Sequence, residues 1–167
     1  YGPRAIREAS TQFPYYKRGR GYYDPERDRP MLADLEMRDA GDVEVVPTLL
    51  EENAKRIAEA VAALLSRRIF PVCLGGDHSV TAAILPAFSD TPIHLVQIDA
   101  HMDFVDRLCG APATHASPMR RARELSHVVS LTQVGIRSIV SGAADYAAAR
   151  GMGNRIVTTA QVLERPG

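Results

Sequence analysis

The chain has 167 residues, of which 46% are hydrophobic and 24% are charged, so it is long and apolar enough for one folded domain and is not a disordered chain. Its 20 Lys and Arg residues balance 20 Asp and Glu residues, and the formal net charge of zero provides no global field to attract nucleic acid or an anionic membrane. The composition therefore predicts a small-molecule partner.

The sequence carries no stretch with the length of a membrane span and no signal-peptide layout at its start. Cys73 lies in an apolar run and Cys109 in a loop rich in Gly and Pro, so the two make a poor disulfide framework and favour a reducing compartment. We expect a cytoplasmic protein. Because the chain begins at Tyr1 instead of Met, we also expect it to be part of a longer sequence.

Residues 1–30 form a polar, aromatic and basic region interrupted by Gly and Pro. Here the sequence predicts a short helix from Pro3 to Ser10 followed by a long loop. Loops of this length tend to be functional or mobile, and a flexible tail is the alternative. Further along, residues 43–46 are a β-branched run after turn residues, which predicts a short strand near the surface.

Residues 31–167 alternate between helical and strand patterns. The clearest helix is Thr48–Arg68, where Leu, Ile and Val recur at helical spacing. The apolar run Ile69–Leu74 predicts a strand that is covered on both faces of a parallel sheet. The other predicted elements are helix 80–88, strand 93–98, helix 118–125, strand 128–136, helix 143–150 and strand 155–158. This order predicts a single α/β domain over residues 1–167, with βα units that carry the candidate site.

Potential metal ligands follow the predicted strand 93–98 in the sequence Asp99-Ala100-His101-Met102-Asp103. On an extended segment Asp99, His101 and Asp103 project to one side, with successive ligands roughly 6.5 to 7 Å apart. Three ligands in a line suit a pair of ions better than a single ion. Asp and His also gather at strand ends as loop and cap residues, which is the alternative interpretation.

A second cluster, Gly75-Gly76-Asp77-His78-Ser79, follows the predicted strand 69–74. Sites in open parallel sheets gather at the carboxyl ends of strands, and adjacent strands lie about 4.8 Å apart. If the two strands are neighbours, His78 reaches the ion bound by Asp99 and Asp103, while His101 faces a second ion. Mixed carboxylate and imidazole ligands favour Mn, Fe, Co or Zn, and such an ion pair can activate water for hydrolysis.

Three other histidines lie outside the two clusters and are candidates for a catalytic or a structural role. His115 lies in a loop expected above the same end of the sheet, where it can pass a proton to a leaving amine. A surface-loop histidine is the alternative there. His94 begins a predicted strand and His127 follows a predicted helix, and for both the sequence favours a structural role.

Together, the two clusters resemble the first two signature motifs of the ureohydrolases, the arginase and agmatinase family. Residues 114–122, Thr-His-Ala-Ser-Pro-Met-Arg-Arg-Ala, are similar to the loop that carries the catalytic histidine of agmatinase-type members. Further similar segments lie at residues 2–7, 39–43 and 134–137, so the resemblance spans nearly the whole chain.

The resemblance implies a three-layer α/β/α fold with a mostly parallel sheet, two Mn²⁺ ions per complete active site, and hydrolysis of a guanidino group to urea and an amine. It implies that His78, Asp99 and Asp103 bind one Mn²⁺ ion. It implies that His101 and a bridging Asp99 bind the other. His115 would be the acid and base residue that also contacts the substrate.

The family's third metal motif, Ser-x-Asp-x-Asp-x-x-Asp-Pro, does not occur in the sequence. We therefore expect an N-terminal partial chain with an incomplete arginase-like fold, which is inactive or nearly inactive by itself. Ala116, Ser117 and Met119 also depart from the common Gly, Thr and Phe of agmatinase-like members, which leaves the substrate size open.

The leading hypothesis is an agmatinase-like enzyme with a small guanidino substrate. The alternatives are a guanidinobutyrase, an arginase or a formiminoglutamase and, in another class, a non-catalytic fragment or regulatory relative. Family members commonly form trimers or hexamers, so we expect a homo-oligomer of the full-length protein, without a nucleic-acid or membrane partner.

Overall fold

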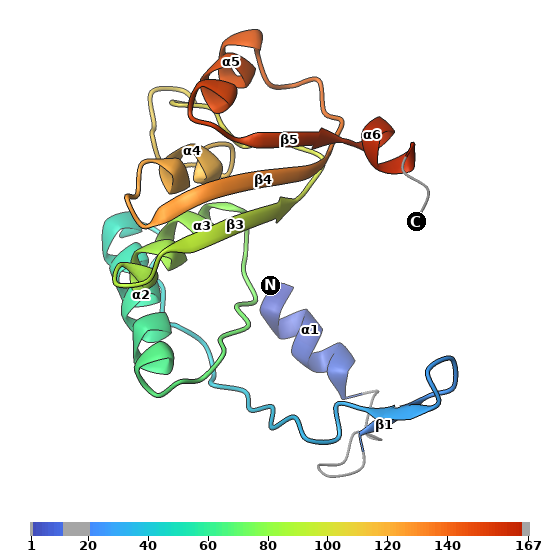
Figure 1. Ribbon diagram of the computed structural model, residues 1–167. Coiled ribbons are helices and arrows are strands. Elements are labelled where there is room, and N and C mark those ends of the chain that lie inside the picture. Colours follow the sequence, from blue (N-terminus) through green and yellow to red (C-terminus); the bar gives the residue numbers. More distant parts are fainter. Residues whose placement is uncertain (1, 12–20, 165–167) are drawn as a thin grey trace. The chain divides into compact units, whose positions relative to one another are not determined.

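The computed structural model describes residues 2–11 and 21–164, which belong to two compact units, Tyr1–Val43 and Glu44–Gly167 (Figure 1). The elements of the first unit are helix α1 (Gly2–Ser10) and strands β1 (Tyr22–Asp24) and β2 (Arg29–Met31). None of the helices in these ranges combines the length and the apolar character needed to cross a membrane.

The first unit confirms the predicted N-terminal helix and corrects the loop after it. Strands β1 and β2 pair as a short antiparallel hairpin, with Tyr22 opposite Met31. Its turn is held by Asp24, whose carboxylate accepts hydrogen bonds from the backbone N–H groups of Glu26 and Arg27. Strands of three residues are too short for an alternating pattern to reveal them, so the sequence predicted a loop. The part of that loop at residues 12–20 lies outside the described residues.

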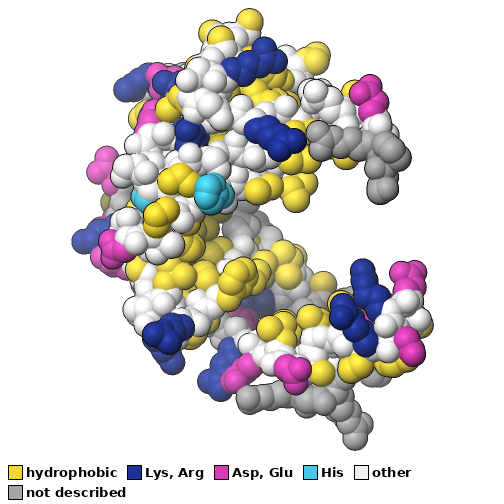
Figure 2. All heavy atoms as spheres, viewed as in Figure 1, with side chains coloured by type: hydrophobic (Ala, Val, Ile, Leu, Met, Phe, Trp, Pro, Cys, Tyr) yellow, Lys and Arg dark blue, Asp and Glu magenta, His cyan; other side chains and the backbone are white. Residues whose placement is uncertain are grey.

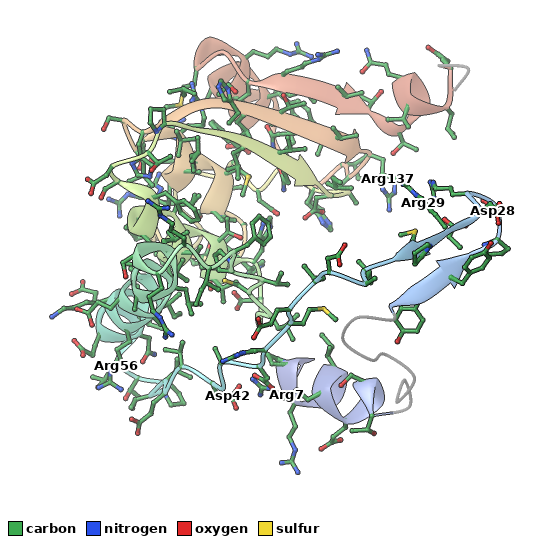
Figure 3. The ribbon with its side chains drawn as sticks, turned by 60° about the horizontal axis from the view of Figure 1, so that its bottom comes forward. Arg7, Asp28, Arg29, Asp42, Arg56 and Arg137 are labelled. Atoms are coloured by element: carbon green, nitrogen blue, oxygen red, sulfur yellow. The ribbon has the colours of Figure 1, made fainter. Side chains whose placement is uncertain are left out.

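An arginine from α1 organises the end of the first unit. The Arg7 guanidinium donates to the Asp39 carboxylate at 2.6 Å and to the Asp42 carboxylate at 2.6 Å (Figure 3). Asp39 also accepts a hydrogen bond from the Gly41 backbone N–H at 2.9 Å. The hydrogen bond from Arg7, aided by that from Gly41, holds the pKa of Asp39 below its ordinary value.

The second unit carries the remaining elements in the order α2 (Leu50–Ser66), α3 (Ser79–Ile84), the 3₁₀ helix η1 (Leu85–Phe88), β3 (Ile93–Ile98), α4 (Pro118–Arg123), β4 (Val128–Ile136), α5 (Ala143–Gly151), β5 (Arg155–Thr158) and α6 (Thr159–Leu163). The predicted helices and the strands from residue 93 onward are confirmed to within a few residues. Helix α6 was not predicted from the sequence. Its signal was the capping box in which Thr158 Oγ1 accepts from the Gln161 N–H and Gln161 Oε1 accepts from the Thr158 N–H.

Strands β3, β4 and β5 form a parallel sheet in that order. Ile98 at the end of β3 lies opposite Val134 of β4, which in turn lies opposite Val157 of β5, so the carboxyl ends of the strands meet at one edge. This confirms the α/β class with a parallel sheet. The alternation of strand and helix produces it because a parallel connection needs a crossover segment between strands.

One face of this sheet carries the hydrophobic core. Helices α4 and α5 both pack on it, since Met119 and Ala149 belong to the same buried cluster as Leu131 of β4. The core also includes Met102 and Phe104, which follow β3. The segment that leaves β3 is therefore anchored in the core by its apolar residues, while the alternate residues of the same segment are left for the site.

Two predicted strands of the chain are wrong. Residues 69–74 pair with no strand among the described residues, and Phe70 is 87% exposed. Figure 2 shows that many hydrophobic side chains, coloured yellow, lie at the surface. An apolar run forms a strand only where a neighbouring strand accepts its backbone hydrogen bonds.

The predicted strand 43–46 likewise has no partner strand within residues 2–11 and 21–164, and its last residue shows why. The backbone N–H of Val46 donates to Asn53 Oδ1 at 2.9 Å, and the carbonyl of Val46 accepts from Asn53 Nδ2 at 2.7 Å. A side chain of α2 therefore occupies the backbone groups that a neighbouring strand would have used. This contact was not predictable from the strand pattern, because it joins a loop to a helix.

Candidate metal centre

The site begins where β3 ends. The strand stops at Ile98, and the Asp99 N–H still donates to the Val134 carbonyl at 3.0 Å before the chain turns. The turn is fixed by the residues that directly follow β4, because the backbone N–H groups of Arg137 and Ser138 both donate to the Ala100 carbonyl at 3.0 Å. The sequence predicted that Asp99, His101 and Asp103 project from one face of an extended segment. Because the chain turns after Ile98, this prediction is wrong.

Two backbone conformations allow this turn. Asp103 has a φ of 47°, in the left-handed region that non-glycine residues rarely adopt. Gly135 of β4 has a φ of 88°, and a Cβ atom there would lie 3.3 Å from the Asp99 carbonyl oxygen. Glycine thus lets β4 approach the backbone of Asp99 closely.

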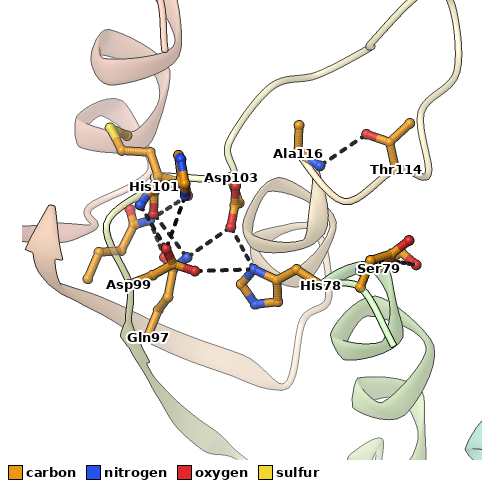
Figure 4. A network of polar contacts seen from close by, with 11 residues as sticks. His78, Ser79, Gln97, Asp99, His101, Asp103, Thr114 and Ala116 are labelled. Atoms are coloured by element: carbon orange, nitrogen blue, oxygen red, sulfur yellow. Dashed lines mark hydrogen bonds and ion pairs between the residues drawn. The ribbon is translucent and has the colours of Figure 1, made fainter. Parts of the chain in front are cut away.

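The turn brings three of the predicted ligands together. The ligand atoms of His78, Asp99 and Asp103 all lie within 4.8 Å of one another (Figure 4). His78 Nδ1 is 2.6 Å from Asp103 Oδ2 and 3.6 Å from Asp99 Oδ2. All three side chains are partly buried, so they form a half-enclosed cluster at the carboxyl edge of the sheet.

His101 lies on the other side of Asp99 and outside this group of three. Its Nδ1 is 3.4 Å from Asp99 Oδ1, and its backbone N–H donates to the same oxygen at 2.8 Å. The two carboxylate oxygens of Asp99 therefore face different imidazoles, with Oδ2 toward His78 and Oδ1 toward His101. This is the arrangement expected of a carboxylate shared between two neighbouring sites.

His78 reaches the cluster from the start of α3. The residue before it, Asp77, accepts hydrogen bonds from the N–H and the hydroxyl of Ser79, which forms a tight turn at the helix start. These two bonds hold the pKa of Asp77 below its ordinary value, with a smaller contribution from the charge of His115. Asp77 therefore positions His78 through the backbone.

The electrostatics of the cluster match a cation site. The hydrogen bond to Asp103 raises the pKa of His78 against the opposing effect of burial, and the charges of Asp103, Asp99 and Asp77 raise it further. Burial by itself would raise the pKa of Asp99, but the His101 backbone hydrogen bond and the charges of both histidines lower it. Two carboxylates and one imidazole are a donor set for a divalent ion, which replaces the imidazole proton when it binds.

His115 lies in a loop that is tied to the same segment. The Val105 N–H donates to the Ala116 carbonyl at 3.1 Å, and the Met119 N–H donates to the Asp103 carbonyl at 3.1 Å. The side chain of His115 is exposed, and its charge acts on Asp77. These backbone bonds thus tie the residues that directly follow His115 to the segment that carries Asp103.

The other histidines have structural partners. His94 Nδ1 is 2.8 Å from Ser130 Oγ, and His127 Nε2 is 3.0 Å from the Leu85 carbonyl oxygen. Neither belongs to the cluster of potential metal ligands found in the described part of the chain. These positions agree with the structural roles that the sequence favoured.

Sequence reasoning missed the amides behind the cluster. Gln97 donates a hydrogen bond to Asp103 Oδ2 at 3.3 Å. Gln97 itself accepts a hydrogen bond from Gln133, and Gln133 accepts one from Asn154. The available signal was a glutamine in each of two apolar strands, since a buried polar side chain requires a partner. The partner was not evident because it depends on how the strands align.

The arginase family model matches residues 1–166, and the chain belongs to the arginase family. Human mitochondrial guanidino acid hydrolase is 32% identical over 161 residues, which cover 94% of this chain and 44% of that protein. Agmatinase from Bacillus subtilis is 32% identical over 154 residues, which cover 91% of this chain and 50% of the enzyme. The chain thus spans about half the length of these relatives.

Solved structures show the same fold. Formimidoylglutamase from Bacillus subtilis superposes with a TM-score of 0.80 at 26% identity, covering 98% of this chain and 50% of that one. A formiminoglutamase from Trypanosoma cruzi, determined with Mn²⁺, gives a TM-score of 0.81 at 21% identity, covering 98% of this chain and 54% of that one. The α/β fold of this chain therefore matches about half of each structure.

Proposed function

We propose that the protein to which this chain belongs is a binuclear manganese hydrolase that cleaves a guanidino group to urea and an amine. The observation that carries the proposal is the cluster of His78, Asp99 and Asp103, with ligand atoms within 4.8 Å of one another at the carboxyl edge of a parallel sheet. Membership of the arginase family and the similarity to an agmatinase and a guanidino acid hydrolase support this reaction class.

The donor geometry supports two neighbouring ions. His78, Asp103 and Asp99 Oδ2 would hold one of them, while Asp99 Oδ1 and His101 would contribute to the other. Carboxylate and imidazole ligands suit Mn²⁺, which is also the ion in the formiminoglutamase structure from Trypanosoma cruzi. When bound, such an ion pair lowers the pKa of water and makes a nucleophile available near neutral pH.

The residues of the chain have distinct roles in this reaction. Asp99 and Asp103 fix the ligand geometry, and the turn between them is held by the residues directly after β4. His115 passes a proton to the leaving amine, as an imidazole can do near neutral pH. The backbone bonds of Ala116 and Met119, which follow His115, restrict its loop and so keep this acid close to the cluster.

The substrate is proposed to be a small guanidino compound, with agmatine first and guanidinobutyrate and other guanidino acids next. A formiminoglutamase is the second candidate because of the TM-score of 0.80 against formimidoylglutamase. A cytoplasmic location and a homo-oligomeric assembly stay predictions.

An assay of urea release tests the proposal. The intact protein that contains this chain is loaded with Mn²⁺ and given agmatine, guanidinobutyrate, arginine and, with detection of formamide, formiminoglutamate. We expect turnover of a guanidino substrate in the wild type and its loss in His78→Ala, with normal activity in the control His94→Ala. Turnover of formiminoglutamate alone would favour the second candidate, and no turnover of any amidine would overturn the proposal.

The 167-residue chain by itself is expected to show little or no turnover. Its candidate ligands give the second ion only Asp99 and His101, and the affinity of a site depends on the number and geometry of its ligands. Urea release by the 167-residue chain at the rate of the intact protein would contradict this expectation.

A further inference from the structure

Three buried amides connect the interior of the sheet to the candidate metal centre. Gln97 lies in β3, Gln133 lies in the neighbouring strand β4, and Asn154 directly precedes β5, the next strand of the sheet. Their exposed fractions are 5%, 0% and 8%. Polar side chains at this depth are costly unless they are hydrogen-bonded, so their arrangement requires an explanation.

The amides form a continuous chain of hydrogen bonds that ends at Asp103. Asn154 Nδ2 donates to Gln133 Oε1 at 3.4 Å, and Gln133 Nε2 donates to Gln97 Oε1 at 2.6 Å. Gln97 Nε2 then donates to Asp103 Oδ2 at 3.3 Å (Figure 4). The acceptor, Asp103 Oδ2, is the oxygen that lies 2.6 Å from His78 Nδ1.

The direction of this chain is set by its last acceptor. An ionised carboxylate can only accept, so Gln97 must turn its NH₂ group toward Asp103 and its oxygen toward Gln133. Gln133 must then donate to Gln97 and accept from Asn154. The amide orientations therefore follow from the network, and every member donates toward Asp103.

The same two glutamines also hold the backbone of the turn. Gln97 Nε2 donates to the His101 carbonyl at 3.1 Å, and Gln133 Nε2 donates to the Met102 carbonyl at 2.7 Å. These carbonyls immediately precede Asp103, whose φ is 47°. The glutamines thus fix the conformation of this turn and one carboxylate oxygen at its end.

We propose that Gln97, Gln133 and Asn154 are positioning residues, an amide relay that orients Asp103 for metal binding. The inference rests on the proposed function because it assigns the relay to the metal site proposed there. In the relay, Gln97 acts directly on the Asp103 carboxylate, Gln133 orients Gln97, and Asn154 orients Gln133. The competing interpretation is that the amides only contribute to the stability of the sheet.

The test measures Mn²⁺ affinity and thermal stability in the intact protein. Gln97→Met keeps the length of the side chain and removes its donor to Asp103. Loss of a partner that orients a metal ligand typically weakens metal binding about 10- to 100-fold. We expect a loss in this range, measured by titration followed by electron paramagnetic resonance, with an altered Mn²⁺ spectrum.

Leu131→Ala is the matched control because Leu131 is buried in β4 and belongs to the core instead of the relay. It should lower the thermal midpoint at least as much as Gln97→Met and leave the Mn²⁺ affinity within two-fold of the wild type. If Gln97→Met does not fold, Gln133→Met carries the same test, since it leaves Gln97 in place without its orienting donor.

The possible results separate this inference from the proposed function. Wild-type protein that binds no Mn²⁺ would overturn the proposed function and the relay with it. Wild-type protein that binds Mn²⁺, together with folded relay variants of unchanged affinity, would overturn the relay alone. An equal loss of affinity in Leu131→Ala would also overturn it, because the effect would then follow stability.

Discussion

The two segments that supply the candidate metal ligands are built in different ways. Asp99 and Asp103 follow a paired strand, and their turn is fixed by backbone bonds from the residues directly after β4. His78 follows residues 69–74, which pair with no strand in the part of the chain that the structure describes, and is positioned by the Asp77 turn at the start of α3. A ligand cluster therefore does not need every one of its ligands on the sheet, but the ligands that the sheet holds should be the more rigid ones.

The largest loss of Mn²⁺ affinity is expected when Asp103, a ligand that follows a strand of the sheet, is replaced. Asp103→Ala removes a carboxylate that contacts both His78 and Gln97, so Mn²⁺ affinity should fall by more than the roughly 10- to 100-fold typical of a lost outer contact. Isothermal titration of the intact protein with Mn²⁺ measures this. Asp106→Ala is the control, because Asp106 pairs with Arg121 instead. Equal affinity of the two variants would remove Asp103 from the site.

Gly135 tests whether the sheet sets the position of Asp99. Gly135→Ala places a methyl group 3.3 Å from the Asp99 carbonyl oxygen at a φ of 88° and should destabilise the fold by about 1–3 kcal/mol while also weakening Mn²⁺ binding. Thermal or urea unfolding measures the first effect and metal titration the second.

Gly153→Ala separates backbone strain from contact with the site. Gly153 has a φ of 76°, but a Cβ atom there would have nothing within 4 Å. The Gly153→Ala variant should therefore lose stability through the same backbone strain but keep the Mn²⁺ affinity of the wild type. If both alanine variants lose metal affinity equally, close contact with Asp99 is not the reason that position 135 is glycine.

The turn at Asp77 tests the other segment. Asp77→Ala removes the acceptor of the Ser79 N–H and hydroxyl, and the loss of such a cap costs about 0.5–2 kcal/mol. Because His78 is the adjacent residue, Mn²⁺ affinity should fall as well, though less than in Asp103→Ala. Asp145→Ala removes a comparable cap at α5, where Asp145 accepts from the Gly142 N–H at 3.0 Å. That control should lose stability only; a normal metal affinity in Asp77→Ala would show that the turn does not position His78.

The same contrast explains how far the sequence could predict this structure. Strands β3, β4 and β5 were predictable because each apolar run has its partners within the described chain. The run at 69–74 shows the same local pattern without such a partner, and local pattern carries no information about pairing. Hydrophobic periodicity therefore identified the candidate strands but not the sheet they join.

The candidate site was predictable in its residues and less so in its geometry. Motif spacing identified His78, Asp99 and Asp103 as a group, but the predicted geometry was wrong. Residues 69–74 form no strand beside β3 in the described part of the chain, and the segment with Asp99 and Asp103 turns after Ile98. The roles of Gln97 and Gln133 were missed, since their contact depends on the parallel register of β3 and β4.

The smallest effect on stability is expected from a substitution in the first unit, at Arg7, which is distant in sequence from the site. Arg7 lowers the pKa of Asp39, so the pairing stabilises the unit above the ordinary pKa of an aspartate and is lost as the pH falls through the lower pKa of the folded state. Both groups are open to solvent, so the stabilisation should be small and sensitive to salt. Arg7→Ala should therefore flatten the acid limb of the unfolding curve, measured by circular dichroism between about pH 2 and 6.

Arg4→Ala is the matched control, because Arg4 makes an exposed pair with Glu8 within α1 and does not reach Asp39. Its acid limb should follow the wild type, since an exposed pair of this kind contributes little. If Arg7→Ala and Arg4→Ala behave alike, the contacts of Arg7 with Asp39 and Asp42 do not hold α1 to the segment that follows the hairpin. That result would mean that charge pairing with Asp39 and Asp42 does not stabilise the first unit.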